Sequence, residues 1–162
     1  QRRERVFFCA VQDDLDVPKL ELALRHRWIS AGEATKDVQV LTEAEKQNTK
    51  PTGTDKSYWQ KTKPGNDYST VSGGSAFNNV KLHSHHPSRT LSSTHGNFTH
   101  WTECRRLTFR EWKRLGSFPD DYHAKTDKIG KYMIGMSVPP KMTEAVARAV
   151  IDQWLLPEIA HA

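Results

Sequence analysis

The stretch RLTFREWKRLGSFPDDY, residues 106–122, gives the first fixed point of the fold. Thr108 stands three residues before Glu111, which is the spacing of a capping box at the N-terminus of a helix. The spacing therefore predicts a helix over Phe109–Leu115. Gly116 follows directly, and the next few residues include a proline, so the helix should end there.

A second helix is predicted over residues 140–155. Pro139 and Pro140 suit a first helical turn. Apolar residues then recur every four positions as far as Trp154, which gives one apolar face of an amphipathic helix. Because the polar face carries few cations, we expect this helix to dock on protein rather than on a membrane.

The remaining sequence is polar and rich in turn signals. Capping-box spacings at Ser30 and Thr42 predict short helices over 31–37 and 43–47. Cys9 lies in an apolar run and is expected to be a buried thiol. The expected strands are Val6–Val11, Tyr58–Trp59, Tyr68–Val71, Val80–Leu82 and Arg89–Ser92, and a further short helix is expected over Leu20–Trp28.

Positive charge is concentrated in the middle of the chain. The 162 residues carry a formal net charge of +5. Between Lys46 and Arg114 there are twelve Lys and Arg but four Asp and Glu. A basic segment that contains aromatic residues indicates a polyanion partner, although a solvated basic face produces the same pattern.

The sequence contains no apolar run of about 18 residues, so we expect no membrane partner and a cytoplasmic location. Its two cysteines have neither metal nor redox spacing. The chain opens on Gln1 within a charged run, which leads us to expect part of a longer polypeptide. Composition suggests three parts, which are residues 1–17, 18–102 and 103–162.

Four blocks follow one another in the chain: QRRERV (1–6), PSRTL (87–91), the stretch 106–122 and IGMSVPP (134–140). In this order they resemble the C-terminal blocks of DNA cytosine-5 methyltransferases. That family has a Q-x-R-x-R block, a variable target-recognition region with a Thr-Leu pair, an R-x-L-T-x-R-E…FPD block and a G-N-x-V-P-P block. The third and fourth blocks are long and specific.

The resemblance implies an α/β fold. The chain would be a fragment of a Rossmann-like S-adenosylmethionine-dependent methyltransferase domain plus a small irregular, β-containing target-recognition domain. Residues 1–17 would end the catalytic core, and residues 18–102 would form a linker and the recognition region. Residues 103–162 would carry the closing blocks and a helix that returns to the catalytic domain.

The sequence also departs from the family pattern. Gly116 stands where many members have Gln, and Met136 stands where many have Asn. The family nucleophile is a cysteine that follows a proline, and neither Cys9 nor Cys104 does so. The Glu-Asn-Val block and the glycine-rich cofactor loop are missing from this sequence as well. We therefore expect the chain to be inactive alone.

The resemblance assigns roles to particular side chains. Arg5, supported by Arg3, would stabilise charge on the pyrimidine ring or its phosphate, because a guanidinium is planar and permanently charged. Surface charge beside a strand is the alternative reading of both arginines. The cofactor would be S-adenosylmethionine, bound mainly by parts outside this sequence. Ser137 is the better candidate for a cofactor contact and Met136 the weaker one.

The expected partner is double-stranded DNA. Base reading in the major groove uses Arg, Lys, Asn and Gln, and phosphate contacts set the register. The DNA-binding candidates are Lys81, Arg89, Thr90, Ser92 and Asn97, of which Thr90 resembles the recurrent threonine of the family. Histidines gather in the same segment. They have no cysteine partners and lack zinc-finger spacing, so we predict no metal site.

The predicted function is methyl transfer from S-adenosylmethionine to C5 of a flipped cytosine in a specific duplex sequence. This chain would supply DNA recognition and part of the active site, completed by an N-terminal catalytic portion or subunit. The alternatives are a non-catalytic DNA-binding module and one subunit of a split methyltransferase. Restriction–modification and viral self-protection both fit the family.

Overall fold

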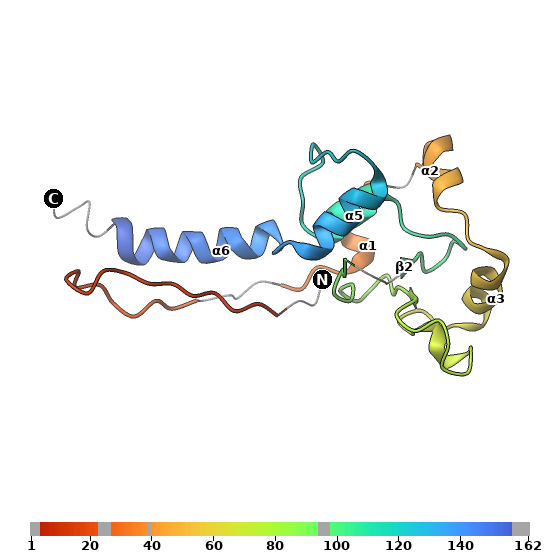
Figure 1. Ribbon diagram of the computed structural model, residues 1–162, viewed down its shortest axis with the longest axis horizontal. Helices are drawn as coiled ribbons and strands as arrows, with labels where there is room; N and C mark the ends of the chain where they lie inside the picture. Colours follow the sequence, from red (N-terminus) through yellow and green to blue (C-terminus); the bar gives the residue numbers. More distant parts are fainter. Residues whose placement is uncertain (1–3, 23–26, 39, 94–97, 157–162) are drawn as a thin grey trace. The chain divides into compact units, whose positions relative to one another are not determined.

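The computed structural model describes residues 4–22, 27–38, 40–93 and 98–156 (Figure 1). The chain divides into two compact units. The first is formed mainly by Trp28–Ser137, and the second by Glu4–Arg27 together with the chain from Val138 onward. Helices and a small sheet occur together, in line with the expected mixed α/β class.

The first unit begins with short, polar elements and ends with two longer helices. In chain order it contains α1 (Ala31–Ala34), α2 (Glu43–Asn48), α3 (Gly53–Lys61), the 3-10 helix η1 (Tyr68–Thr70), β1 (Val80–Lys81), β2 (Phe98–Thr99), α4 (Phe109–Leu115) and α5 (Asp127–Met136).

Complete capping boxes start three of these helices. Thr42, Thr52 and Thr108 each accept a hydrogen bond from the backbone N–H three residues later, and the carboxylate at that third position accepts one in return. The predicted helices over 43–47 and 109–115 are confirmed. The helix expected over 31–37 is present as the shorter α1, which Ser30 caps.

Four of the predicted strands are wrong or shortened. Residues 58–59 belong to α3, which the Thr52 cap starts, and residues 68–70 form η1. The strand expected over 80–82 is present as β1, but its parallel partner is β2 rather than residues 89–92. Val80 pairs with Phe98, and Lys81 pairs with Thr99.

The core of the first unit lies where the small sheet meets α4 and α5. Leu91 and Ile134 are almost completely buried, and the ring of Phe98 stacks on Trp112 at 5.7 Å between centroids. The burial of these side chains supplies the main apolar stabilisation of a chain that is otherwise polar. The core residues are Ala31, Val80, Leu82, Leu91, Phe98, Leu107, Trp112, Leu115 and Ile134.

Helix α5 was not predicted from the sequence. Two glycines inside it lower its intrinsic helix propensity. Both are needed for close packing. A Cβ at Gly130 would lie 2.4 Å from the ring of Phe109, and a Cβ at Gly135 would lie 2.4 Å from the backbone of residues 92–93.

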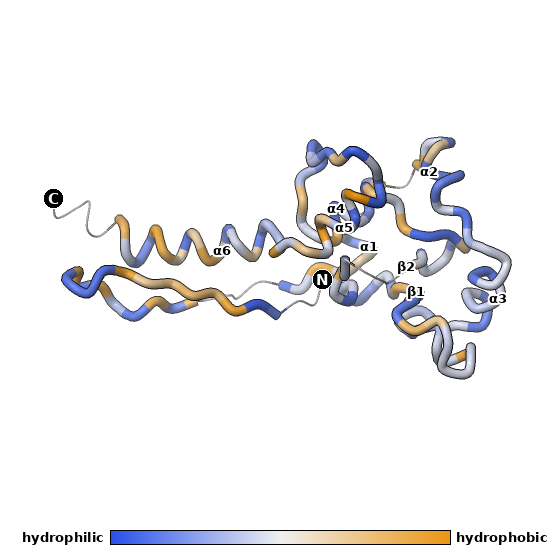
Figure 2. The backbone as a smooth tube through the Cα atoms, in the orientation of Figure 1, coloured by the Kyte–Doolittle hydropathy of each residue, from blue (hydrophilic) through white to orange (hydrophobic). Residues whose placement is uncertain are grey.

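The second unit pairs an extended segment with a long helix. As predicted, α6 (Pro140–Val150) begins at the proline pair and continues as a π-helical turn, η2 (Ile151–Leu155). The Trp154 indole N–H donates to the Pro18 carbonyl at 2.8 Å, and Gln153 exchanges two hydrogen bonds with the backbone of Glu21. Figure 2 shows apolar residues along both the helix and the extended segment.

Three expectations for the second unit differ from the structure. Residues 6–11 are extended but pair with no strand among the described residues, and Phe8 is 96% exposed. Cys9 is exposed rather than buried. A run of apolar residues becomes a buried strand only where a neighbouring layer covers it. The described part of Leu20–Trp28, residues 20–22 and 27–28, is not helical, and the remainder lies outside the described residues.

Lys131 of α5 makes the stability of the first unit depend on pH. Its ammonium group donates to the Leu107 carbonyl at 2.7 Å, and burial lowers its pKa to about 8. The unfolded chain binds the proton with a pKa near 10.5. Between these values the unfolded state holds more protons, so the free energy of unfolding should rise with pH, by up to about 3 kcal/mol.

Urea unfolding of the wild type and of Lys131→Met, followed by tryptophan fluorescence between about pH 7.5 and 9.5, checks this expectation. The difference between the two proteins isolates Lys131, because all other titrating groups are shared. If both free energies follow the same pH course, Lys131 is not the source of the effect.

Candidate nucleic-acid interface

Three segments that lie apart in the sequence meet beside Gly65. The turn over residues 63–66 places Gly65 at a φ of 91°, a left-handed conformation that favours glycine. The Arg89 guanidinium donates to the Gly65 carbonyl at 3.4 Å and lies 3.8 Å from an Asp67 carboxylate oxygen. The Cβ atom of His83 is 3.7 Å from where a Cβ on Gly65 would lie.

We refer to the exposed and half-exposed residues of these three segments as the basic turn surface. It consists of Lys63, Gly65, His83, His85, His86 and Arg89.

The histidine turn within this surface is fixed to helix α1. The backbone N–H groups of Ala31 and Gly32 donate to the carbonyls of His86 and Ser84 at 2.8 and 2.9 Å. Gly32 permits this contact, since a Cβ there would be only 2.9 Å from the Ser84 carbonyl oxygen. The first N–H groups of the helix, which lack partners within it, are thereby satisfied by the turn.

The side chain of Lys81, a predicted DNA contact, is not part of this surface, although its carbonyl accepts the Gly65 N–H at 2.7 Å. It is 7% exposed. Its ammonium donates to the Trp59 carbonyl at 3.2 Å and stands 3.7 Å from the centre of the Trp59 ring. The Lys81 charge therefore interacts with Trp59 inside the unit, because a cation over an indole face is favourable.

Thr90 and Ser92 follow Arg89 in the segment that leads into the core. Thr90 is exposed, and Ser92 is partly buried. Leu91 between them is fully buried and anchors the segment. The backbone after Ser92 lies against Gly135 of α5, so the recognition candidates and the closing block are in direct contact.

The two cofactor candidates are at the C-terminal end of α5. Met136 is 61% exposed. Ser137 caps the helix, and its hydroxyl donates to the Met133 carbonyl at 2.6 Å. The Ser137 hydroxyl therefore already donates its proton to a carbonyl of its own helix.

Of the catalytic candidates, Arg5 is described and Arg3 lies outside the described residues, as does the DNA candidate Asn97. Arg5 belongs to the second unit. It is exposed, and its guanidinium donates to the neighbouring Glu4 carbonyl at 2.7 Å.

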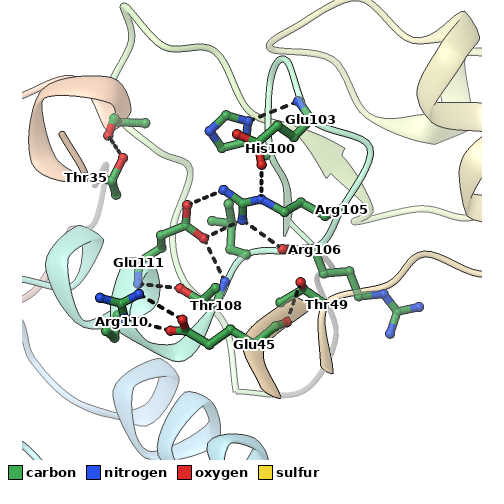
Figure 3. A network of polar contacts seen from close by, with 12 residues as sticks. Thr35, Glu45, Thr49, His100, Glu103, Arg105, Arg106, Thr108, Arg110 and Glu111 are labelled. Carbon is green, nitrogen blue, oxygen red and sulfur yellow. Dashed lines mark hydrogen bonds and ion pairs between the residues drawn. The ribbon is translucent and has the colours of Figure 1, made fainter. Parts of the chain in front are cut away.

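Arg105, Arg106 and Arg110 form ion pairs within the first unit. Arg105 forms two parallel hydrogen bonds to Glu111, at 2.8 and 2.9 Å, with side chains only 10% and 2% exposed (Figure 3). Glu111 also accepts the Thr108 N–H of the capping box at 2.7 Å. One carboxylate thus caps α4 and neutralises a buried guanidinium.

Two further arginines repeat this pattern. Arg106 bonds Asp55 at 2.7 Å. Arg110 bonds both carboxylate oxygens of Glu45, as Figure 3 shows. Asp55 and Glu45 are the third-position acids of the capping boxes of α3 and α2. The hydrogen bond from Arg110 lowers the pKa of Glu45. The capping-box acids of α2, α3 and α4 are therefore each paired with one arginine.

Sequence reasoning missed the partners that position Arg89. Asp67, which is buried, caps η1 and also accepts the Asn78 N–H, and it was not singled out. The turn signal at residues 63–66 was visible in the sequence, but the strand pairing that brings it to Arg89 was not. Gly135 was part of a recognised block, yet nothing local indicated its contact with Ser92.

Within the part of the chain that the structure describes, no three His, Cys, Asp or Glu side chains gather as metal ligands would. None of the helices in the described ranges is long and apolar enough to span a bilayer.

The basic turn surface exposes imidazoles and a guanidinium beside the small sheet, as in a protein that contacts nucleic acid. The family model for C-5 cytosine-specific DNA methylase matches residues 1–152. The chain therefore belongs to the C-5 cytosine-specific DNA methylase family, which confirms the family expected from its sequence blocks. This family uses S-adenosylmethionine as its methyl donor.

Similar curated proteins are all described as Type II methyltransferases. M.BbvI of Brevibacillus brevis is 40% identical over 79 residues, which are 46% of this chain and 21% of that protein. M1.HphI of Haemophilus parahaemolyticus is 36% identical over 73 residues, 44% of this chain and 20% of that protein. M.AquIB of Picosynechococcus sp. is 34% identical over 88 residues, 46% of this chain and 63% of that protein.

The chain thus spans about a fifth of the length of M.BbvI and M1.HphI. No solved structure matches it. Two side chains at one helix end, of which Ser137 is already hydrogen bonded, do not enclose a molecule the size of S-adenosylmethionine. Met136 and Ser137 therefore do not by themselves form a site that fits this cofactor.

Replacing Glu111 with Gln should destabilise the first unit strongly. Glutamine keeps an oxygen for the capping-box hydrogen bond, so the variant removes mainly one of the two carboxylates that face Arg105. Glu103, at 2.6 Å and 55% exposed, still pairs with Arg105. We therefore expect a loss of about 3 kcal/mol, the lower end of the range for removal of one partner of a buried ion pair. Urea unfolding followed by tryptophan fluorescence measures the loss.

Glu45→Gln is the matched control, since its partner Arg110 is 42% exposed and water screens the pair. We expect it to cost about 1 kcal/mol or less. Equal losses in the two variants would contradict a special role for the buried pair.

Proposed function

We propose that this chain provides the DNA-recognition region and the closing blocks of a cytosine-5 DNA methyltransferase. The complete enzyme would move a methyl group from S-adenosylmethionine to C5 of a cytosine rotated out of the duplex. The observation that carries the proposal is the family match together with the basic turn surface around Arg89.

The nucleophile of the reaction is assigned to a part of the enzyme outside this sequence. Such a group must be a thiolate to add to the pyrimidine ring. Partial burial raises the pKa of Cys104, although Lys56 and Lys81 oppose the rise, so this thiol stays protonated at neutral pH. Cys9 follows Phe8 rather than a proline. Neither cysteine fits the role.

Arg5 and Arg3 are proposed to act on the flipped base. A guanidinium beside the pyrimidine oxygen or its phosphate stabilises the charge that develops on the ring. The exposure of Arg5 supports this role, because its hydrogen bond to the carbonyl of the neighbouring Glu4 lies at the surface, where a substrate could replace it. Met136 and Ser137 would then border the cofactor, which is held mainly by the Rossmann-like portion.

A second candidate function is one subunit of a split methyltransferase. M.AquIB supports it, because a match of similar size covers 63% of that chain but 21% of M.BbvI. M.AquIB is therefore a much shorter chain that is also called a methyltransferase. Coding sequence for the Pro-Cys and Glu-Asn-Val blocks, in frame before Gln1 or in a separate neighbouring gene, distinguishes the two arrangements. Its absence from both places would favour a non-catalytic DNA-binding module.

The chain alone should not transfer methyl groups. We expect no product from S-adenosylmethionine and a cytosine-containing duplex, and turnover once a polypeptide with the missing blocks is added. Radiolabelled methyl incorporation measures both. Turnover by the chain alone would contradict the proposal, and so would failure of every complementing polypeptide from the same genome.

Arg89→Ala should weaken DNA binding by the chain and reduce its salt dependence. Removal of one phosphate contact lowers the slope of log affinity against log salt by about one. Asp67 keeps the hydrogen bonds that it accepts from Ser69 and Asn78, so the turn should stay folded.

Arg148→Ala removes the same charge from an exposed arginine of α6 and is the matched control. Fluorescence anisotropy with a labelled duplex at several salt concentrations gives both slopes. An Arg89 variant with the slope of the control would remove Arg89 from the interface.

A further inference from the structure

The turn over His83–His86 carries three imidazoles on one short, fixed segment. The rings of His83 and His86 stack at 4.1 Å between centroids with an interplanar angle of 17°, and the His85 ring is 5.8 Å from that of His83. His85 and His86 are exposed. Two carbonyls of the turn are bonded to α1, which fixes the backbone of the turn. Arg89 follows three residues after His86, and its guanidinium bonds the Gly65 carbonyl, close to which the His83 side chain also lies.

His83 has a structural task within the turn. Its Nδ1 atom accepts the backbone N–H of His85 at 3.1 Å, which leaves the ring proton on Nε2. Desolvation lowers the pKa of His83, and the neighbouring His86 and His85 lower it further, so its ring is neutral at neutral pH.

His85 and His86 have no such task. Among the described residues, the structure contains no hydrogen bond to a side-chain nitrogen of either ring. A neutral or protonated imidazole offers an N–H donor at the surface. Two such donors on a turn whose backbone is fixed, three residues before Arg89 in the sequence, form a site suited to a repeating anion.

We propose that His85 and His86, beside Arg89, bind the backbone phosphates of duplex DNA. This inference rests on the proposed DNA-recognition function and adds a contact that sets the position of the protein on the duplex. Phosphates are favoured over bases because the turn is tied at two backbone points to α1, which suits a contact of constant geometry along any sequence.

The test compares DNA binding by the full chain and by the double variant His85→Ala/His86→Ala, which removes both imidazole N–H donors. His83 is kept, because its ring holds the turn. Loss of these hydrogen bonds should weaken binding about two- to tenfold at about 50 mM salt, as measured by fluorescence anisotropy. The loss should be the same for duplexes of unrelated sequence.

His123→Ala, at another exposed histidine of the first unit, should leave the affinity unchanged. His86→Lys places a permanent cation on the turn and should tighten binding, with a salt slope steeper by about one. Circular dichroism melting temperatures confirm that the variants are folded.

Each outcome decides between the two proposals. Wild-type affinity in the double variant, with no gain in His86→Lys, overturns the phosphate site and leaves the proposed function standing. A loss restricted to one duplex sequence overturns the phosphate assignment in favour of base reading. If the wild type does not bind DNA at low salt, both the phosphate site and the DNA-recognition function of the chain fail.

Discussion

The ion pair between Arg105 and Glu111 joins the loop before α4 to the first turn of that helix. Its carboxylate is also the capping group of the helix, so burial of the pair and formation of α4 depend on each other. Arg106 and Arg110 repeat the arrangement at the starts of α3 and α2. A chain with few apolar residues in this region thereby gains long-range order from charge-assisted hydrogen bonds. The charges of these arginines are already paired with carboxylates inside the unit. The surface proposed to bind a polyanion is instead the basic turn surface around Arg89.

Several local signals in the sequence were read correctly, although the capping box of Thr52 and Asp55 that starts α3 was missed. Thr42 and Thr108 start helices because a capping box involves residues only three positions apart. The helix after Pro139 follows from a four-residue apolar period that needs no knowledge of the neighbour. The sequence blocks identified the family for a similar reason, since their residues are contiguous.

Features that depend on distant partners were missed. Residues 6–11 have strand composition, but composition does not say whether a sheet covers them. Helix α5 contains glycines that local propensity counts against it, although close packing requires them. Lys81 looked like a surface cation until the pairing of β1 with β2 placed it over Trp59. At the candidate site, the block PSRTL (87–91) pointed to Arg89, whereas no sequence signal marked Gly65 and Asp67 as its partners.

The contact of Gly135 with the chain after Ser92 is made through backbone atoms. Exposed side chains of that segment, such as that of Thr90, are therefore not part of the contact that holds it against α5. On the proposed function, this arrangement would separate side chains that face DNA from the backbone contact and the buried Leu91 that hold the segment in place. New sequence specificities would then arise by substitution of exposed residues in the segment, while α5 and Gly135 keep its backbone in place.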